Sequence, residues 1–240
     1  MNTFVGVDLG WYGKPSGLAS LVLDGPELRL RALERLQAVD DIVGWILGEA
    51  GRGSGIIAVD APLVIRNETG IRDAERQLNA DFRRFHAGCH AANLGRPFAQ
   101  NVISFSRRLE SLGFRHGASI QPRQEGRFQI EIHPHAATVS MFGLDRIVKY
   151  KRGSRAERAG GLRRLRKLAL SRLPILNPPL RLSLPRVPET GPTKSVEDRI
   201  DAVMCAYIGA HWWFWGTGRN WLYGTKRDGY IIVPKPPASS

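Results

Sequence analysis

The sequence has only two cysteines, Cys89 and Cys205, among its 240 residues. Two thiols are too few for a disulfide-rich scaffold, and both suit a reducing compartment. The sequence also lacks any apolar stretch near the roughly 18 to 20 residues that a membrane span needs. The first residues lack the basic and then apolar layout of a secretion signal, because Asp8 interrupts the apolar run early. We therefore expect a cytoplasmic protein without a membrane partner, and no particular protein partner is indicated.

The composition is otherwise that of a folded protein. Hydrophobic residues make up 42% and charged residues 24% of the chain, with 26 glycines and 15 prolines. This balance argues against global disorder and against a collagen-like chain. A chain of this length can bury one large core, so we expect a single domain over residues 1–240 that contains an insertion.

Acidic residues are nearly absent from one segment. Residues 146–186 contain 13 Lys and Arg and a single acid, Glu157, so this segment accounts for +12 of the formal net charge of +13. A basic excess confined to one segment indicates a surface for a polyanion such as DNA or RNA. Judged by charge alone, a solvated helix with basic side chains explains this segment about as well as a nucleic-acid-binding surface does.

Alternating apolar residues near the N-terminus predict three strands in succession. They cover residues 4–10, 17–23 and 28–36 and are joined by short turns, which is typical of an antiparallel meander. We expect a helix next, over 41–49, and then a fully apolar strand at 56–60. A strand that is apolar on both faces normally lies in the centre of a sheet with helices over it. The order predicts an α/β fold.

The second half of the chain is expected to be mainly helical. The patterns predict helices at 67–85, 104–112, 136–144, 156–173 and 194–215, strands at 127–133 and 229–233, and a proline-rich connection over 174–192. The helix at 156–173 is basic and amphipathic, so it carries much of the positive charge.

Carboxylates lie where predicted elements end or face inward. Asp8 lies in the first strand, Asp60 closes the buried strand, and Glu131 lies inside a later strand. Asp198 and Asp201 are three residues apart on the last helix and share roughly one face. An acid in an apolar strand is costly unless it is paired, protonated or bound to a cation. Convergent carboxylates that hold two divalent metals are the apparatus of in-line phosphodiester cleavage.

Each carboxylate also has an ordinary structural explanation. Asp8 and Asp60 could cap turns, and Glu131 could pair with a buried arginine. Asp198 could interact with the dipole of its own helix. Taken one at a time, these explanations are favoured. Taken together, and with a basic segment elsewhere in the chain, the acids favour a metal site.

Five motifs together resemble a known superfamily. They are FVGVDLG, IIAVDAPL, IEIHPHAA, DRIDAVMCAYIGA and GYIIVP, spread in this order over nearly the whole chain. The sequence resembles the RNase H-like superfamily and, more narrowly, a family designated domain of unknown function 429 and described as predicted RNase H-like nucleases. This resemblance implies an α/β fold with a mixed sheet of five strands, the first three antiparallel, and helices on both faces.

The resemblance also implies a nuclease that hydrolyses phosphodiester bonds in DNA or RNA with Mg²⁺ or Mn²⁺, two ions being expected. Asp8 and Asp60 match the acids that end the first and fourth strands. The Asp198 and Asp201 pair looks like the one in RuvC-type resolvases, and Glu131 matches an acid typical of the narrower family. Asp8 would bridge the ions, with Asp60 and Asp201 as further ligands. Either Asp198 or Glu131 would complete the set of metal ligands.

The basic helix and its flanks would hold the nucleic-acid backbone without reading the base sequence. The candidate residues are Lys149, Lys151, Arg152, Arg155, Arg158, Arg163, Arg164, Arg166 and Lys167. They belong to a basic and proline-rich insertion at about 146–192, which lies outside the core of the superfamily.

The glycine-rich segment HAGCHAANLGRP is a second insertion relative to the superfamily. His86, Cys89 and His90 suggest a zinc site, but a structural site needs four ligands and no second pair with matching spacing is visible. A hydrogen-bonded loop is therefore favoured for this segment.

Two other classes of function remain open. Actin-like ATPases and sugar kinases share the core fold, and GVDLG followed by Gly13 and Gly17 resembles their first phosphate loop. The chain is short for their duplicated domain and lacks a clear second loop, so this class ranks below a nuclease. The third class is a nucleic-acid-binding module that has lost catalysis, which the acids in place argue against.

Overall fold

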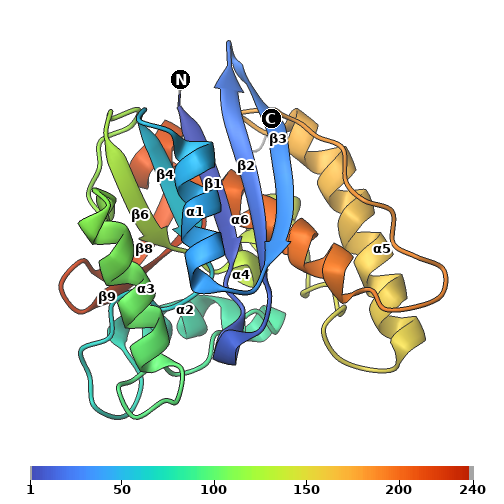
Figure 1. Ribbon diagram of the computed structural model, residues 1–240. Helices are drawn as coiled ribbons and strands as arrows, with labels where there is room; N and C mark the ends of the chain where they lie inside the picture. The colour runs from blue at the N-terminus through green and yellow to red at the C-terminus, as the bar shows by residue number, and fades with distance from the viewer. Residues whose placement is uncertain (1, 238–240) are drawn as a thin grey trace.

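A mixed β-sheet runs through the middle of the molecule, described here from a computed structural model over residues 2–237 (Figure 1). Its strands are β1 (Thr3–Asp8), β2 (Ser16–Asp24), β3 (Glu27–Leu36), β4 (Gly55–Val59), β5 (Arg115–His116), β6 (Arg127–Glu131) and β7 (Leu180–Arg181). They lie in the order β5-β6-β4-β1-β2-β3-β7. The meander β1-β2-β3 is antiparallel, whereas β4 runs parallel to both β1 and β6. The predicted meander and the central place of residues 56–60 are therefore confirmed.

The expected number of strands was wrong, because the sheet has seven strands and not five. The two additional strands, β5 and β7, contain two residues each and lie at the two edges of the sheet. A strand this short shows no alternation in the sequence. A separate hairpin of β8 (Asn220–Thr225) and β9 (Gly229–Pro234) follows the last helix. The sequence predicted β9 but not β8.

Helices cover both faces of the sheet, as expected (Figure 1). They are α1 (Val39–Ala50), α2 (Asp73–Phe82), α3 (Ala99–Ser111), α4 (Pro134–Phe142), α5 (Arg155–Arg172) and α6 (Lys194–Trp215). Apolar side chains of α1 and α3 form one core with one face of the sheet. Those of α2, α4, α5 and α6 form a larger core with the other face and with the β8-β9 hairpin. None of the described helices is long and apolar enough to cross a membrane.

Two glycines allow the buried helix α6 to lie directly on the meander. A Cβ atom on Gly6 would lie 2.0 Å from the carbonyl oxygen of Ala202, and one on Gly17 would lie 1.9 Å from that of Asp198. Any side chain at these positions would collide with helix backbone, so glycine is required for the close approach. The contact places the turn of α6 that carries Asp198 and Asp201 beside the end of β1.

Candidate active site

Asp8 and Asp60 meet at the carboxyl ends of two neighbouring parallel strands. β1 ends at Asp8, and the backbone NH of Asp60, just after β4, donates a hydrogen bond of 2.9 Å to Val7. Side chains alternate along a strand, so Asp8 shares the face of Gly6, and Asp60 shares the face of Ala58. That face is the one that α6 covers. Both acids are partly exposed, the Asp60 side chain by 25%.

Asp201 reaches the same place from α6. Its side chain is only 2% exposed, and its Oδ1 accepts a hydrogen bond of 2.8 Å from the Tyr150 hydroxyl. The charge of Asp201 raises the pKa of both Asp8 and Asp60, which places the three carboxylates in one electrostatic cluster. Three elements far apart in the sequence thus bring together three of the five predicted acids. We call Asp8, Asp60 and Asp201 the acidic cluster.

The acidic cluster is short of positive charge. Burial raises the pKa of Asp8 well above its ordinary value, the Lys151 ammonium opposes this rise, and the charges of Asp201 and Asp60 add to it. Burial likewise raises the pKa of Asp60 to about 6, against the effect of Lys151. Carboxylates crowded in a site of low polarity retain their protons unless a cation compensates them. One lysine therefore does not satisfy three acids.

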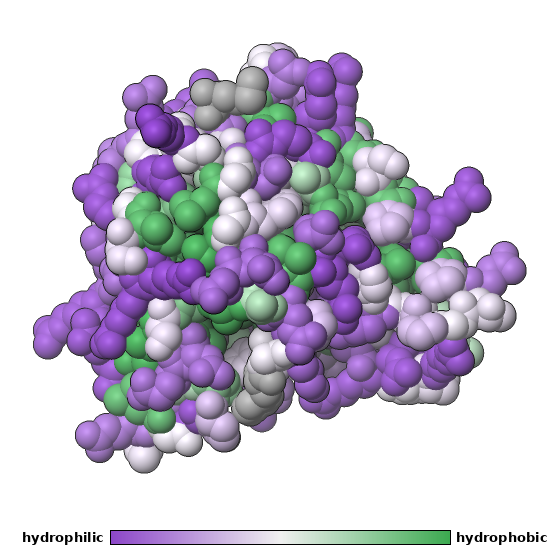
Figure 2. Space-filling view, viewed as in Figure 1, coloured by the Kyte–Doolittle hydropathy of each residue, from purple (hydrophilic) through white to green (hydrophobic). Residues whose placement is uncertain are grey.

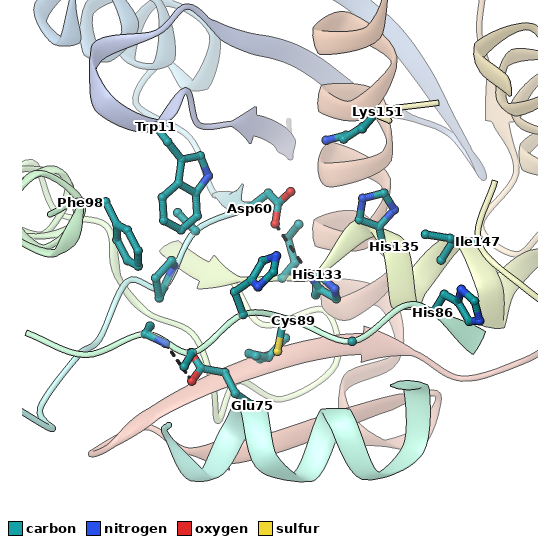
Figure 3. Close-up of a pocket in the computed structure, with 18 of the residues that line it drawn as sticks. Trp11, Asp60, Glu75, His86, Cys89, Phe98, His133, His135, Ile147 and Lys151 are labelled. Carbon is teal, nitrogen blue, oxygen red and sulfur yellow. Dashed lines mark hydrogen bonds and ion pairs between the residues drawn. The ribbon is translucent and has the colours of Figure 1, made fainter. Parts of the chain in front are cut away.

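Lys151 lies among the acids. Its Nζ is 2.8 Å from Oδ2 of Asp201, and its side chain is 35% exposed. In Figure 3 its side chain extends toward the part of the cavity into which Asp60 points. The sequence placed Lys151 in a run of basic residues as a contact for nucleic-acid phosphates. The structure gives it carboxylate neighbours as well, while Lys149 and Arg152 line the same cavity.

Asp198, the fourth predicted acid, is already paired. Its Oδ2 accepts a hydrogen bond of 2.8 Å from Nε of Arg35, and its Oδ1 lies 2.7 Å from Nζ of Lys194. Its side chain is 2% exposed. Its charge still contributes to the raised pKa of Asp8. Asp198 therefore lies beside the acidic cluster with both oxygens engaged by other side chains.

Glu131, the fifth predicted acid, forms a buried ion pair with Arg72. The guanidinium of Arg72 donates to both carboxylate oxygens of Glu131 and also to Glu75. The backbone NH of Leu63 donates a further hydrogen bond of 3.0 Å to Glu131. Burial raises the pKa of Glu131 and Arg72 opposes the rise. The sequence analysis had left open that Glu131 pairs with a buried arginine, and the structure shows this pair. The pair keeps Glu131 out of the acidic cluster.

A cavity of about 1080 Å³ opens beside the acidic cluster. Asp60 and Lys151 line one part of it, and Trp11 and Phe98 line another (Figure 3). The two aromatic rings lie edge to face with centroids 4.0 Å apart, and Trp11 is 38% exposed. The cavity therefore combines carboxylates, a cation and an accessible aromatic surface.

His133 is a candidate site residue that the sequence analysis did not single out. Burial lowers its pKa to about 4, so the ring is neutral near neutral pH. Its Nε2 lies 3.1 Å from the carbonyl oxygen of Ala87, which can only accept, so Nε2 carries the proton. The other nitrogen, Nδ1, is then an acceptor, and it lies 4.0 Å from Oδ1 of Asp60. A cation between these two acceptors would relieve their repulsion.

The HAGCH segment forms part of the wall of the cavity. His86, Cys89 and His90 all line it. The side chain of Asn79 on α2 bonds both the NH and the carbonyl of Cys89, which fixes the loop to that helix. Within residues 2–237, no three His, Cys, Asp or Glu side chains are close enough, as they stand, to hold a metal ion.

The basic residues of α5 divide into two groups. Four of them donate to backbone carbonyls, and three of these four, Arg155, Arg163 and Arg166, hold the proline-rich segment against the helix. The side chains of Arg164 and Lys167 on α5, and of Lys149 and Arg152 just before it, are exposed and make no hydrogen bond or ion pair with any residue that the structure describes. Hydrophilic side chains project from the edge of the molecule where α5 lies (Figure 2).

The fold and site together define an α/β protein with a mixed sheet, a buried helix across it, and an acidic cluster at the carboxyl ends of its central strands. Residues 6–224 match the profile of a family described as protein of unknown function (DUF429), and the chain belongs to this family. No curated protein matches the sequence. Among solved structures, RuvC from Thermus thermophilus is 14% identical, with 88% of this chain and 94% of that chain covered and a TM-score of 0.36. A similarity this remote carries no argument about activity.

Proposed function

We propose that the protein is an RNase H-like nuclease that hydrolyses phosphodiester bonds in DNA or RNA with the help of Mg²⁺ or Mn²⁺. One observation carries the proposal: Asp8, Asp60 and Asp201 come together from β1, β4 and α6, and Asp60 lines an open cavity. Carboxylates gathered at the carboxyl ends of central strands are suited to hold a hard cation and a charged substrate.

The donor atoms and the charge of the cluster suit a divalent cation, which would have to draw the three carboxylates closer together than they lie in the described structure. Three carboxylates against the one ammonium of Lys151 leave a formal charge of minus two. Carboxylate oxygens are the ligands that Mg²⁺ and Mn²⁺ prefer. Asp8, Asp60 and Asp201 would hold the ion, and Nδ1 of His133 offers a nitrogen donor beside Asp60. When bound, such an ion supplies charge compensation for the phosphate and makes water more acidic.

The protein's own residues would orient the site and the substrate. The Tyr150 hydroxyl fixes the rotamer of Asp201, which is otherwise enclosed by protein. The cavity would admit a substrate strand as far as Asp60, and the exposed face of Trp11 would be available to stack on a base. Lys149 and Arg152 also line the cavity and would contact phosphates on the way to α5.

The proposal is tested by cleavage of labelled single-stranded, duplex and branched DNA and RNA in Mg²⁺ or Mn²⁺. Asp8→Asn and Asp201→Asn are expected to lower cleavage by about 100-fold or more, because each removes a charge that the reaction needs. Asp24→Asn is the matched control, since Asp24 is an exposed acid in the same sheet, at the end of β2 remote from Asp8.

The outcomes separate the proposal from its rivals. Metal-dependent cutting that is lost in both site variants and retained in Asp24→Asn supports a nuclease and identifies its substrate. Binding without cutting, with a steep dependence on salt, would instead support a nucleic-acid-binding module. Cutting that survives in both site variants would rule out the acidic cluster as its source.

A further inference from the structure

Lys151 is held in the acidic cluster by well-packed neighbours. The preceding residue, Tyr150, is 5% exposed and donates its hydroxyl to Asp201. One residue earlier, a Cβ atom on Gly161 would lie 1.9 Å from the carbonyl oxygen of Lys149, so α5 lies directly on the backbone that leads into Lys151. The packed backbone of Lys149 and Tyr150 fixes the position from which the Lys151 side chain reaches Asp201. Its contact with Asp201 therefore follows from the packing of the chain.

The ammonium of Lys151 lies beside the cluster. Its Nζ is 2.8 Å from Oδ2 of Asp201, and its side chain lines the same cavity as Asp60. With Lys151 in place, one divalent ion brings the three acids to formal neutrality. A second divalent ion would add two positive charges to a confined site that no longer needs them. The arrangement thus suits one metal ion and one ammonium.

On the basis of the proposed nuclease function, we propose that Lys151 is a catalytic residue that takes the place of a second metal ion. Its ammonium contacts an oxygen of the scissile phosphate and stabilises the negative charge that develops there. In the reaction, the hydroxyl of water bonds to phosphorus while the bond from phosphorus to the leaving oxygen breaks, and the remaining proton of water ends on the leaving oxygen. Lys151 is a fixed positive charge that neither gains nor loses a proton. This revises the expectation of two ions.

The first test counts metal ions on the wild-type protein by calorimetric titration with Mn²⁺ and by the paramagnetic resonance of bound Mn²⁺. We expect one Mn²⁺ per chain, lost in Asp8→Asn. Two Mn²⁺ per chain in a protein that cuts nucleic acid would overturn the role of Lys151 and leave the nuclease proposal intact. A protein that binds no Mn²⁺ and cuts nothing would overturn both. This count needs no substitution at Lys151.

The second test removes the ammonium with Lys151→Met. The cluster then has one more uncompensated negative charge, so Mn²⁺ should bind about tenfold tighter or with a second equivalent. Cleavage should fall by about 100-fold or more, because a charge that acts in the transition state is missing. Lys151→Arg keeps a cation in the site and should retain more activity than Lys151→Met.

Lys226→Met is the matched control, because Lys226 is an exposed lysine in the β8-β9 turn. It makes the same change in net charge and should leave both Mn²⁺ binding and cleavage unchanged. The role of Lys151 is overturned if Lys151→Met binds Mn²⁺ and cuts as the wild type does. Unfolding curves of all variants show whether each protein is folded, and Lys151→Arg provides the comparison if the methionine variant is not.

Discussion

At the scale of single residues, Arg72 holds together three parts of the chain around the cavity. Its guanidinium donates to Glu131 on β6, to Glu75 on α2 and to the carbonyl of Val64. All three charged side chains are 2–4% exposed. A buried carboxylate without a partner is strongly destabilising, so Arg72 stabilises the protein by pairing with two buried carboxylates.

Arg72→Met should lower the free energy of unfolding by about 3–5 kcal/mol, because it leaves two buried carboxylates unpaired. Urea unfolding followed by circular dichroism measures the change. Arg76→Met is the control four residues further on, in α2, since Arg76 pairs with Asp73 where both side chains are exposed. It should change the stability by less than about 1 kcal/mol. Equal effects of the two substitutions would contradict the importance assigned to the buried network.

The sequence predicted the acids of the site better than their partners. Asp8 and Asp60 stand out because each ends an apolar strand, and Asp201 because it lies on a long apolar helix. The pairing of Asp198 depends on Arg35, which is 163 positions away along the chain. Lys151 gave no signal of its own within a basic run. Its direction is decided by the packing of its neighbours, which a local pattern does not encode.

At the scale of elements, the contact between α6 and the meander positions the site. Gly6→Ala should destabilise the protein by about 3 kcal/mol or more, because the new methyl group would meet the backbone of α6 and backbone cannot give way cheaply. Gly44→Ala is the control, since Gly44 lies in α1 with open space around it and should gain up to about 1 kcal/mol. Thermal unfolding compares the two variants.

Gly6→Ala should also weaken Mn²⁺ binding in whatever fraction remains folded, because the displaced helix carries Asp201 away from Asp8. Unchanged stability in Gly6→Ala would show that α6 can shift at no cost and would contradict the close contact.

Elements with several periods of an apolar pattern were predictable, and short or irregular ones were not. The helix predicted at 194–215 coincides with α6, and the strand predicted at 56–60 nearly coincides with β4. The helix predicted at 67–85 begins only at Asp73, since Gly70 has a φ of 77° in the preceding turn. The edge strands β5 and β7 form only because they pair with β6 and β3, and their own sequences carry no pattern that predicts this pairing.

At the scale of the whole molecule, positive charge is concentrated on one side, around α5. If this side holds a nucleic-acid backbone, affinity should fall steeply as salt rises. Arg164→Ala and Lys167→Ala should each weaken binding for all sequences and reduce the slope of log affinity against log salt by about 1. The side chains of these two residues make no hydrogen bonds within the described structure, so their loss should leave the proline-rich segment in place.

Fluorescence anisotropy with a labelled oligonucleotide over a range of salt concentrations measures these slopes. Arg227→Ala, an exposed cation in the β8-β9 turn, should leave the slope unchanged. If Arg164→Ala and Lys167→Ala also leave it unchanged, α5 is not the binding surface.

Because α6 packs closely on Gly6 and Gly17, the acidic cluster cannot form during synthesis until α6 has been made. Asp8 and Asp60 leave the ribosome early, but Asp201 follows only after most of the described chain has been made. A nascent chain that ends before α6 can pair β1 with β2 and β4, yet the face with the two glycines is then open to water. The third carboxylate arrives together with α6, which covers that face. A nascent chain that ends before α6 therefore carries only two of the three acids of the cluster.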